Sequence, residues 1–266
     1  METLKGKAHA KINLTLDIVG ESRGFHLLDM LVSDIELCDE VTVRERADGK
    51  AECIMDGVPQ DERNSALRAV NLMRRVFKTP YFDVEIEKHI PMSGGLGGST
   101  ADGVAVIRLI AEILDIPRKK ITSEFLLELG SDAPCMYDSG TKRVRETGGK
   151  VDLIDVVWPY NIGFIAGGGV DTAKAYALFD SMRLKGGRAT ERLLKAMEKE
   201  SYDISKYLSN DLFIPAARLN PSVSEAYGRL KASDALAVNM SGSGSTVYGL
   251  WRGEPPRDTV FTRFMR

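Results

Sequence analysis

The stretch from Pro91 to Asp102, PMSGGLGGSTAD, consists mainly of glycine and small hydroxyl residues. Residues 82–87 before it alternate apolar and acidic side chains, which predicts a half-buried strand. Residues 106–114 after it carry apolar side chains at the spacing of a buried helix face, and Pro117 follows them. We therefore expect the glycines to lie at the N-terminus of a helix.

A glycine-rich helix N-terminus suits the binding of phosphate. The first N–H groups of a helix lack partners inside the helix and carry partial positive charge, so they attract anions. Glycines at 94, 95, 97 and 98 let the backbone approach a polyphosphate closely. No lysine follows them as in a P-loop, and Thr100 stands where a dinucleotide fingerprint needs glycine. A flexible connection or a helix cap is the alternative, but it explains one or two glycines better than four.

The first predicted strand, residues 7–19, carries a second set of candidate residues. Its residues alternate, so Lys11, Asn13, Thr15 and Asp17 share one face and the apolar residues share the other. Two interpretations are open. This face either contributes the Lys11 cation and the Asn13 amide to a functional site, or it is the solvent-exposed face of a sheet.

Three further segments contain side chains suited to binding or catalysis. Phe25 and His26 place an aromatic ring beside an imidazole, which fits either a ligand contact or a loop anchor. Asp132 follows Gly130, where a helix is expected to end, and is either functional or a turn residue. The segment Ser241–Gly244 lies between two apolar runs and is either a ligand loop or a turn. His9 and His89 have no partner at metal-ligand spacing, so we interpret them as structural.

Composition excludes several classes of protein. The 266 residues carry a formal net charge of −2, which gives no basic field for nucleic acid or an anionic membrane. No apolar run approaches the ~18 residues of a membrane span, and the N-terminal residues lack the apolar core of a signal peptide. We expect a cytoplasmic protein whose three cysteines are reduced.

The order of the predicted elements indicates an α+β protein with two domains. Strands are expected near residues 35–37, 41–43 and 160–166, and helices over residues 65–76, 172–182, 189–199 and 222–231. Strands and helices interleave without regular βαβ repetition, so we divide the chain into an N-terminal domain, residues 1–155, and a C-terminal domain, residues 156–266.

Taken in order, the early lysine, the central glycine loop, the isolated aspartate and the late Gly-Ser loop resemble the GHMP family of small-molecule kinases. Pro91–Ser99 matches the central motif of that family, and Met240–Gly244 matches its C-terminal motif. Segments 10–14, 24–26, 34–39, 129–134, 171–176 and 210–212 extend the resemblance over almost the whole chain. They are similar to a member that acts on a cytidine diphosphate-linked substrate.

The resemblance implies a role for each candidate residue. Lys11 and Asp132 are implied to be catalytic: Asp132 accepts the proton of a 2-hydroxyl, and Lys11 stabilises charge on the transferring phosphoryl group. The implied ATP-binding residues are Pro91, Met92, Ser93, Gly94, Gly95, Leu96, Gly97, Gly98, Ser99 and Thr100, with Ser99 a candidate Mg²⁺ ligand. The implied substrate-binding residues are Asn13, Phe25, His26, Thr172, Ser241, Gly242, Ser243 and Gly244.

The resemblance also implies the fold and the reaction. The expected fold has an N-terminal domain like domain 2 of ribosomal protein S5 and a ferredoxin-like C-terminal domain. The expected reaction is ATP-dependent phosphorylation with Mg²⁺ in the non-mevalonate isoprenoid pathway. The substrate would be a cytidine diphosphate-linked methylerythritol, bound by a monomer or homodimer. The rival interpretations are another GHMP kinase, acting on mevalonate or homoserine, and a GHMP-fold protein that binds a ligand without catalysis.

Overall fold

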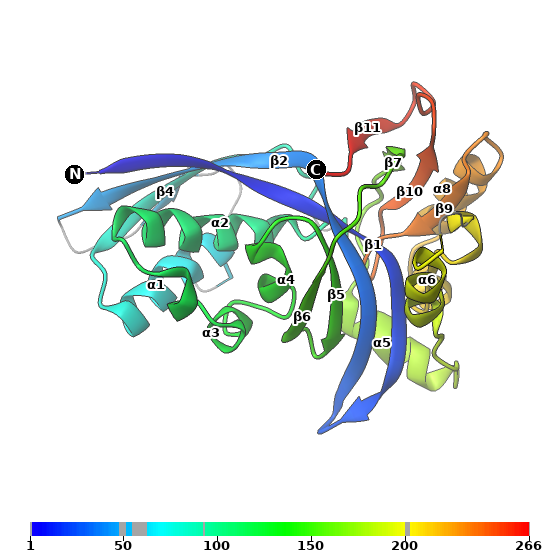
Figure 1. The fold of residues 1–266 in the computed structure, drawn as a ribbon, viewed down its shortest axis with the longest axis horizontal. Coiled ribbons are helices and arrows are strands. Elements are labelled where there is room, and N and C mark those ends of the chain that lie inside the picture. The colour runs from blue at the N-terminus through cyan, green and yellow to red at the C-terminus, as the bar shows by residue number, and fades with distance from the viewer. Residues whose placement is uncertain (1, 48–51, 55–62, 93, 200–202, 266) are drawn as a thin grey trace. The chain divides into compact units, whose positions relative to one another are not determined.

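The computed structural model describes residues 2–47, 52–54, 63–92, 94–199 and 203–265. The chain forms two compact units, each built from separate stretches of sequence. Unit 1 contains Met1–Ala10, Leu37–Ile90 and Gly97–Ser139, and unit 2 contains Lys11–Glu36, Pro91–Leu96 and Gly140–Arg266. Two long strands, β1 (Thr3–Ser22) and β2 (Phe25–Arg46), each continue from one unit into the other (Figure 1). The division into residues 1–155 and 156–266 stays a prediction, since these units interleave in sequence.

Unit 1 consists of the first part of β1, the C-terminal half of β2, two further strands and a layer of helices. Strand β4 (Tyr81–Glu87) pairs antiparallel with residues 40–46 of β2 and parallel with the short β3 (Cys53–Ile54). Helix α1 (Ser65–Phe77) packs on α2 (Gly98–Ile113) and on β4. The unit also contains η1 (Arg118–Lys120), α3 (Ser123–Leu127) and α4 (Ala133–Tyr137).

Local chemistry explains where the helices of unit 1 begin. The Asn64 side chain accepts hydrogen bonds from the backbone N–H groups of Ala66 and Leu67, which caps α1. Helix α2 has no side-chain cap; it begins after Gly97, and its first helical bond runs from Ala101 N to Gly97 O. The N-terminus of α2 is therefore built from glycines.

Unit 2 contains the N-terminal half of β2, a β-hairpin and a second sheet. Strand β5 (Thr141–Glu146) pairs antiparallel with residues 28–33 of β2 and with β6 (Lys150–Ile154). The second sheet has the order β11-β7-β10-β9, with every neighbour antiparallel. Its strands are β7 (Asn161–Ile165), β9 (Ala237–Met240), β10 (Val247–Trp251) and β11 (Val260–Arg263). Every residue of β10 is buried, because this strand lies between two others and under a helix.

The helices of unit 2 follow β7 in the chain. They are α5 (Thr172–Ser181), α6 (Ala189–Met197), η2 (Ile204–Lys206), α7 (Phe213–Leu219) and α8 (Ser222–Lys231). Helix α8 packs on β9 and β10, and α5 packs on α7. The two-residue strand β8 (Ser209–Asn210) pairs parallel with residues 15–16 of β1.

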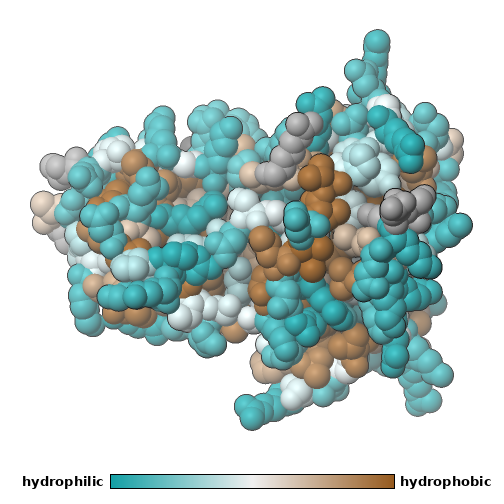
Figure 2. Space-filling model, in the orientation of Figure 1, coloured by the Kyte–Doolittle hydropathy of each residue, from teal (hydrophilic) through white to brown (hydrophobic). Residues whose placement is uncertain are grey.

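The α+β class and most predicted elements are confirmed. The residues near 35–37 and 41–43 form strand as expected, but their separation into two strands is wrong, because β2 runs unbroken through both. The hairpin β5–β6 was not predicted, since its charged residues follow no clear apolar alternation. Across the described ranges, no helix has the length and apolar character needed to cross a bilayer. The face of the molecule in Figure 2 is largely hydrophilic, with smaller hydrophobic areas.

Candidate functional site

The polar face of β1 is buried. Lys11, Asn13, Thr15 and Asp17 are each 3% exposed or less, so the alternative of a solvated sheet face is wrong. Burying a charge or an amide is unfavourable unless it gains polar partners. Each of these residues accordingly has a hydrogen-bond partner: Lys11 bonds to Asn13 on the same strand, and the other three bond to parts of unit 2 that are distant in sequence.

Lys11 and Asn13 are tied to the late Gly-Ser loop. The Lys11 ammonium donates to Asn13 Oδ1 at 2.7 Å, and the backbone N–H of Gly242 donates to the same oxygen at 2.9 Å. The backbone N–H of Asn13 donates to Ser241 Oγ at 3.3 Å. Lys11 and Asn13 thus meet a loop that lies more than two hundred positions later in the chain. The interpretation of Ser241–Gly244 as a turn alone does not explain these contacts.

The first part of the glycine loop joins the same cluster. Ser241 Oγ donates to the carbonyl of Gly95 at 2.9 Å, and Thr246 N donates to that of Gly94 at 2.9 Å. Gly95 has φ +78°, and a Cβ built there would lie 2.3 Å from the Ser241 carbonyl oxygen. Only glycine fits this position. Pro91 is half-buried, Met92 is 72% exposed, and the predicted Ser93 lies outside the described residues.

The second part of the loop forms the start of α2, as predicted. Gly97 is the N-cap residue, and Gly98, Ser99 and Thr100 form the first turn. Their N–H groups precede the first helical hydrogen bond of α2, so they point outward from the helix end. Ser99 is exposed there. This turn has the donors and the hydroxyl oxygen expected of a phosphate site with a metal ion nearby.

Phe25 and His26 begin β2, directly after a tight turn at Arg23 and Gly24. The Phe25 side chain is exposed, whereas the His26 ring stacks on Tyr176 with 4.8 Å between ring centroids. His26 Nε2 lies 2.9 Å from Asp180 Oδ1. His26 is thus held by α5 in a fixed orientation.

A pocket of about 520 Å³ adjoins His26. Its lining combines apolar surface, glycines and the cations Lys185 and Arg188. The lining residues are Ile18, Val19, Gly20, Glu21, His26, Phe179, Asp180, Leu184, Lys185, Gly186, Gly187 and Arg188.

Thr172 and Asp132 occupy two other positions. Thr172, the first residue of α5, shares a 2.7 Å hydrogen bond with Ser243 and so joins the loop cluster of unit 2. Asp132 is half-buried at the start of α4, and its carbonyl accepts a hydrogen bond from the Cys135 thiol at 3.1 Å. Asp132 belongs to unit 1, whereas Lys11 belongs to unit 2.

Sequence reasoning missed Tyr176 and Asp180, which orient His26. They lie four positions apart on α5, so they share a helix face, and this spacing was the available signal. It also missed Lys88, which donates to the carboxylates of both Asp39 and Asp102 in unit 1. No cluster of three or more histidine, cysteine or acidic side chains in the described residues could form a metal site.

Two family models match the chain. The model of the GHMP kinases N terminal domain matches residues 64–140, and the model of the GHMP kinases C terminal region matches residues 188–264. The chain is 32% identical over 260 residues to the 4-diphosphocytidyl-2-C-methyl-D-erythritol kinase of Acetivibrio thermocellus, covering 96% of this chain and 92% of that protein. It is 31% identical to the kinase of the same name from Geobacter metallireducens, and the alignment covers 96% of this chain and 91% of that protein.

Solved structures give the same result for the fold. A crystal structure of 4-(cytidine 5'-diphospho)-2C-methyl-D-erythritol kinase superposes with a TM-score of 0.77 at 25% identity, covering 94% of this chain and 91% of that one. The Methanococcus jannaschii mevalonate kinase superposes with a TM-score of 0.67 at 12% identity, covering 100% of this chain and 99% of that one. At this identity the likeness shows the fold alone. The predicted fold is thereby confirmed. Because both family models match and relatives align over nearly the whole chain, the chain belongs to the GHMP kinase family.

Proposed function

We propose that this chain is an ATP-dependent kinase that phosphorylates the 2-hydroxyl of 4-diphosphocytidyl-2-C-methyl-D-erythritol in the non-mevalonate isoprenoid pathway. The proposal takes the substrate from the printed names of the relatives. The observation that carries it is His26, which Asp180 orients at the edge of a pocket that also contains Lys185 and Arg188.

The polar edge of His26 suits cytosine. A carboxylate only accepts hydrogen bonds, so His26 Nε2 carries the hydrogen that Asp180 accepts. In the neutral imidazole Nδ1 is then an acceptor, which matches the exocyclic amino group of cytosine. A base without that donor would leave a polar atom unpaired, and this gives selectivity. Phe25 would stack on the base, and Lys185 and Arg188 would attract the diphosphate.

Phosphoryl transfer needs mainly positioning and charge stabilisation. The N–H groups at the start of α2 would donate to the phosphates of ATP. Asp132 would accept a hydrogen bond from the attacking hydroxyl and orient it. It would take the proton as the new O–P bond forms and the bond from the γ-phosphorus to the bridging oxygen breaks, so that ADP leaves. Lys11, oriented by Asn13, would offset the negative charge on the transferring phosphoryl group. Asn13 and Thr172 would contact the methylerythritol end of the substrate.

The residues near α2 fit a magnesium ion held mainly by phosphate. Mg²⁺ in kinases takes one or two protein oxygens and fills its remaining positions with phosphate and water. The exposed hydroxyl of Ser99 provides one such oxygen. When bound, the ion would offset charge on the phosphates. A cytoplasmic location, the absence of a nucleic-acid partner and a monomeric or homodimeric state stay predictions.

The first test is a kinase assay with ATP, Mg²⁺ and the cytidyl substrate, run beside mevalonate and homoserine. We expect turnover of the cytidyl substrate alone. Asp132→Asn should lower kcat by roughly 100-fold or more, since it removes the group that accepts the proton. Faster turnover of mevalonate or homoserine would refute the substrate, and ATP binding without any turnover would favour the non-catalytic alternative.

Phe25→Ala tests the contact with the base. We expect the KM of the cytidyl substrate to rise about tenfold with little change in kcat, because stacking on a base contributes ~1–3 kcal/mol. The free energy of unfolding should not change, since the ring is 67% exposed. Phe261→Ala is a matched control, as this phenylalanine on β11 is 47% exposed. Equal effects of the two substitutions on KM would contradict the role of Phe25.

A further inference from the structure

A buried charged cluster in unit 1 lies beneath the start of α2. Lys88 directly follows β4, and its ammonium donates to the carboxylates of Asp39, on β2, and Asp102, on α2, the second at 2.8 Å. The Asp39 and Asp102 side chains are 0% and 4% exposed. Among the described residues, Asp102 Oδ1 is buried without a hydrogen-bond partner. Burying two carboxyl groups beside one partly exposed lysine is unfavourable for stability, and well-packed apolar residues often replace such a group of side chains without loss of stability.

The cluster connects the segment that enters the glycine loop to the helix that leaves it. Asp39 Oδ1 accepts hydrogen bonds from the backbone N–H groups of His89 at 2.6 Å and Ile90 at 2.8 Å. Asp39 therefore fixes the segment before Pro91, while Asp102 lies in the second turn of α2. Lys88 bridges the two.

Gly98 shows how closely the bridge approaches the phosphate-binding turn. A Cβ built on Gly98 would lie 3.0 Å from Ile90 Cγ2 and 3.5 Å from the Lys88 ammonium. The first turn of α2 thus rests on the segment that Asp39 and Lys88 hold. A shift of this segment would move the N–H groups of Gly98, Ser99 and Thr100, and hydrogen bonds to phosphate tolerate little displacement.

We propose that Lys88 is a positioning residue for ATP: by bridging Asp39 and Asp102 it holds the first turn of α2 where its backbone N–H groups bind phosphate. The proposal rests on the proposed function only in assuming that α2 binds ATP. Lys88 acts through the backbone, because its ammonium is engaged by two carboxylates.

The experiment measures ATP affinity by calorimetry without any acceptor substrate, and then KM and kcat of the kinase reaction. We expect Lys88→Met to weaken ATP binding and raise the KM for ATP by about tenfold or more, with kcat and the KM of the acceptor changed less than about threefold. A loss of folded protein alone would lower the apparent kcat and leave the KM for ATP unchanged. Lys88→Arg keeps both ion pairs and should remain within about threefold of the unsubstituted chain.

Lys142→Met is the matched control. Lys142 likewise forms an ion pair with a buried carboxylate, Asp34 in unit 2, at 2.6 Å, and it is itself more buried than Lys88. Its loss should lower stability without weakening ATP binding. Equal weakening in Lys142→Met and Lys88→Met, or unchanged ATP affinity in Lys88→Met, would overturn the proposal.

Two milder variants keep the test decisive if Lys88→Met does not fold. Lys88→Gln retains amide donors but has no positive charge, so its ATP affinity should lie below that of Lys88→Arg. Asp102→Asn still accepts from Lys88, so it should bind ATP within about threefold of the unsubstituted chain, whereas Asp102→Leu should weaken binding about tenfold. ATP affinity unchanged in both Lys88→Gln and Asp102→Leu would overturn the proposal. If ATP binds as expected but the cytidyl substrate is not phosphorylated, the proposed substrate fails and the role of Lys88 stands.

Discussion

At the scale of single residues, burial decides what a polar side chain does. Lys11 and Asn13 on β1 are as buried as core residues, and they are oriented by each other and by Gly242. Phe25 has the opposite character, because its apolar ring is 67% exposed and is therefore available to a ligand. Lys11, which is proposed for catalysis, is thus buried and held by a hydrogen bond, whereas the ring proposed for base stacking is exposed.

Asp102 should make stability depend on pH. Burial, with the nearby charge of Asp39, raises the pKa of the Asp102 carboxyl from 3.8 to about 7, although Lys88 opposes this shift. Between these pH values the folded chain holds a proton that the unfolded chain has released, so this group's contribution to the free energy of unfolding falls as pH rises. The charged groups that act on Asp102 are Lys88 and Asp39. Burial, with the nearby charge of Asp102, raises the pKa of the Cys53 thiol on β3.

Asp102→Asn should remove that dependence, because asparagine resembles the protonated carboxyl. The quantity of interest is the free energy of unfolding of the variant minus that of the unsubstituted chain. We expect this difference to increase by on the order of 3 kcal/mol from pH 4 to pH 8. Urea unfolding at several pH values measures it. Asp203→Asn is the control with the opposite sign, since hydrogen bonds from Ser205 lower the pKa of exposed Asp203. Parallel stability curves for Asp102→Asn and the unsubstituted chain would contradict the prediction.

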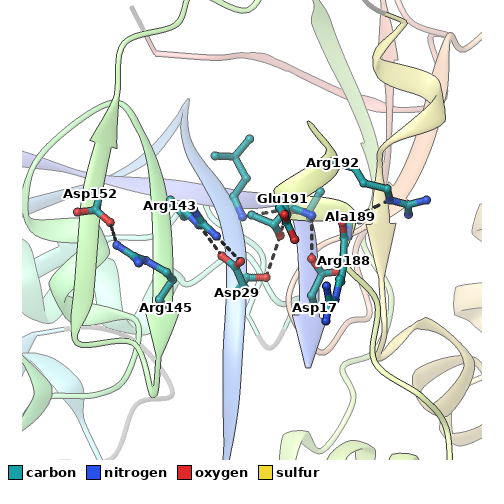
Figure 3. A network of polar contacts seen from close by, with 12 residues as sticks. Asp17, Asp29, Arg143, Arg145, Asp152, Arg188, Ala189, Glu191 and Arg192 are labelled. Atoms are coloured by element: carbon teal, nitrogen blue, oxygen red, sulfur yellow. Dashed lines mark hydrogen bonds and ion pairs between the residues drawn. The ribbon is translucent and has the colours of Figure 1, made fainter. Parts of the chain in front are cut away.

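At the scale of elements, a strand caps a helix that lacks its own cap. Arg188 precedes α6 and makes no capping hydrogen bond with its side chain. Asp17 on β1 instead accepts from the backbone N–H groups of Ala189 at 2.9 Å and Thr190 at 2.7 Å (Figure 3). Arg143 on β5 pairs with the side chain of Asp29, whose carbonyl accepts from the Thr190 hydroxyl. The start of α6 is thus held by two strands, next to pocket residues Gly187 and Arg188.

Asp17→Ala should loosen this helix. The substitution leaves two buried N–H groups without an acceptor, so we expect a loss of about 3 kcal/mol in the free energy of unfolding. Hydrogen exchange should increase in residues 189–197. Asp171→Ala removes an exposed cap of α5 that accepts from Lys174, and it should lower stability by only about 1 kcal/mol. Similar losses in the two variants would show that Asp17 is an ordinary surface cap.

At the scale of the whole molecule, ligand binding should appear as stability. A ligand that binds only the folded chain at 100 times its Kd adds about 2.7 kcal/mol to the free energy of unfolding. For a chain of this size we expect the Tm to rise by roughly 5–10 °C with the cytidyl substrate. Mevalonate and homoserine at equal concentration should leave the Tm unchanged. An equal shift with mevalonate would contradict the cytidyl site even if no turnover were measured.

The sequence was sufficient for features that depend on local order. Alternation predicted β1 and β4, apolar spacing predicted α1 and α2, and the glycines before α2 predicted a helix N-terminus. The order of the motifs identified the family, because motif residues keep their order along the chain whatever their distances in space. Local order failed at β2, where the polar residues from Cys38 to Glu40 interrupt the apolar pattern of a continuous strand.

Only the tertiary structure decided which distant residues meet. The polar face of β1 has the alternation of a solvated strand, and its burial follows from contacts with residues near positions 190 and 241. Likewise, Asp180 beside His26, Asp17 at the start of α6, and Lys88 between Asp39 and Asp102 are contacts between separate elements. Periodicity describes neighbours along one helix or strand, whereas these contacts depend on how elements pack, and packing brings together residues whose spacing in the sequence carries no signal.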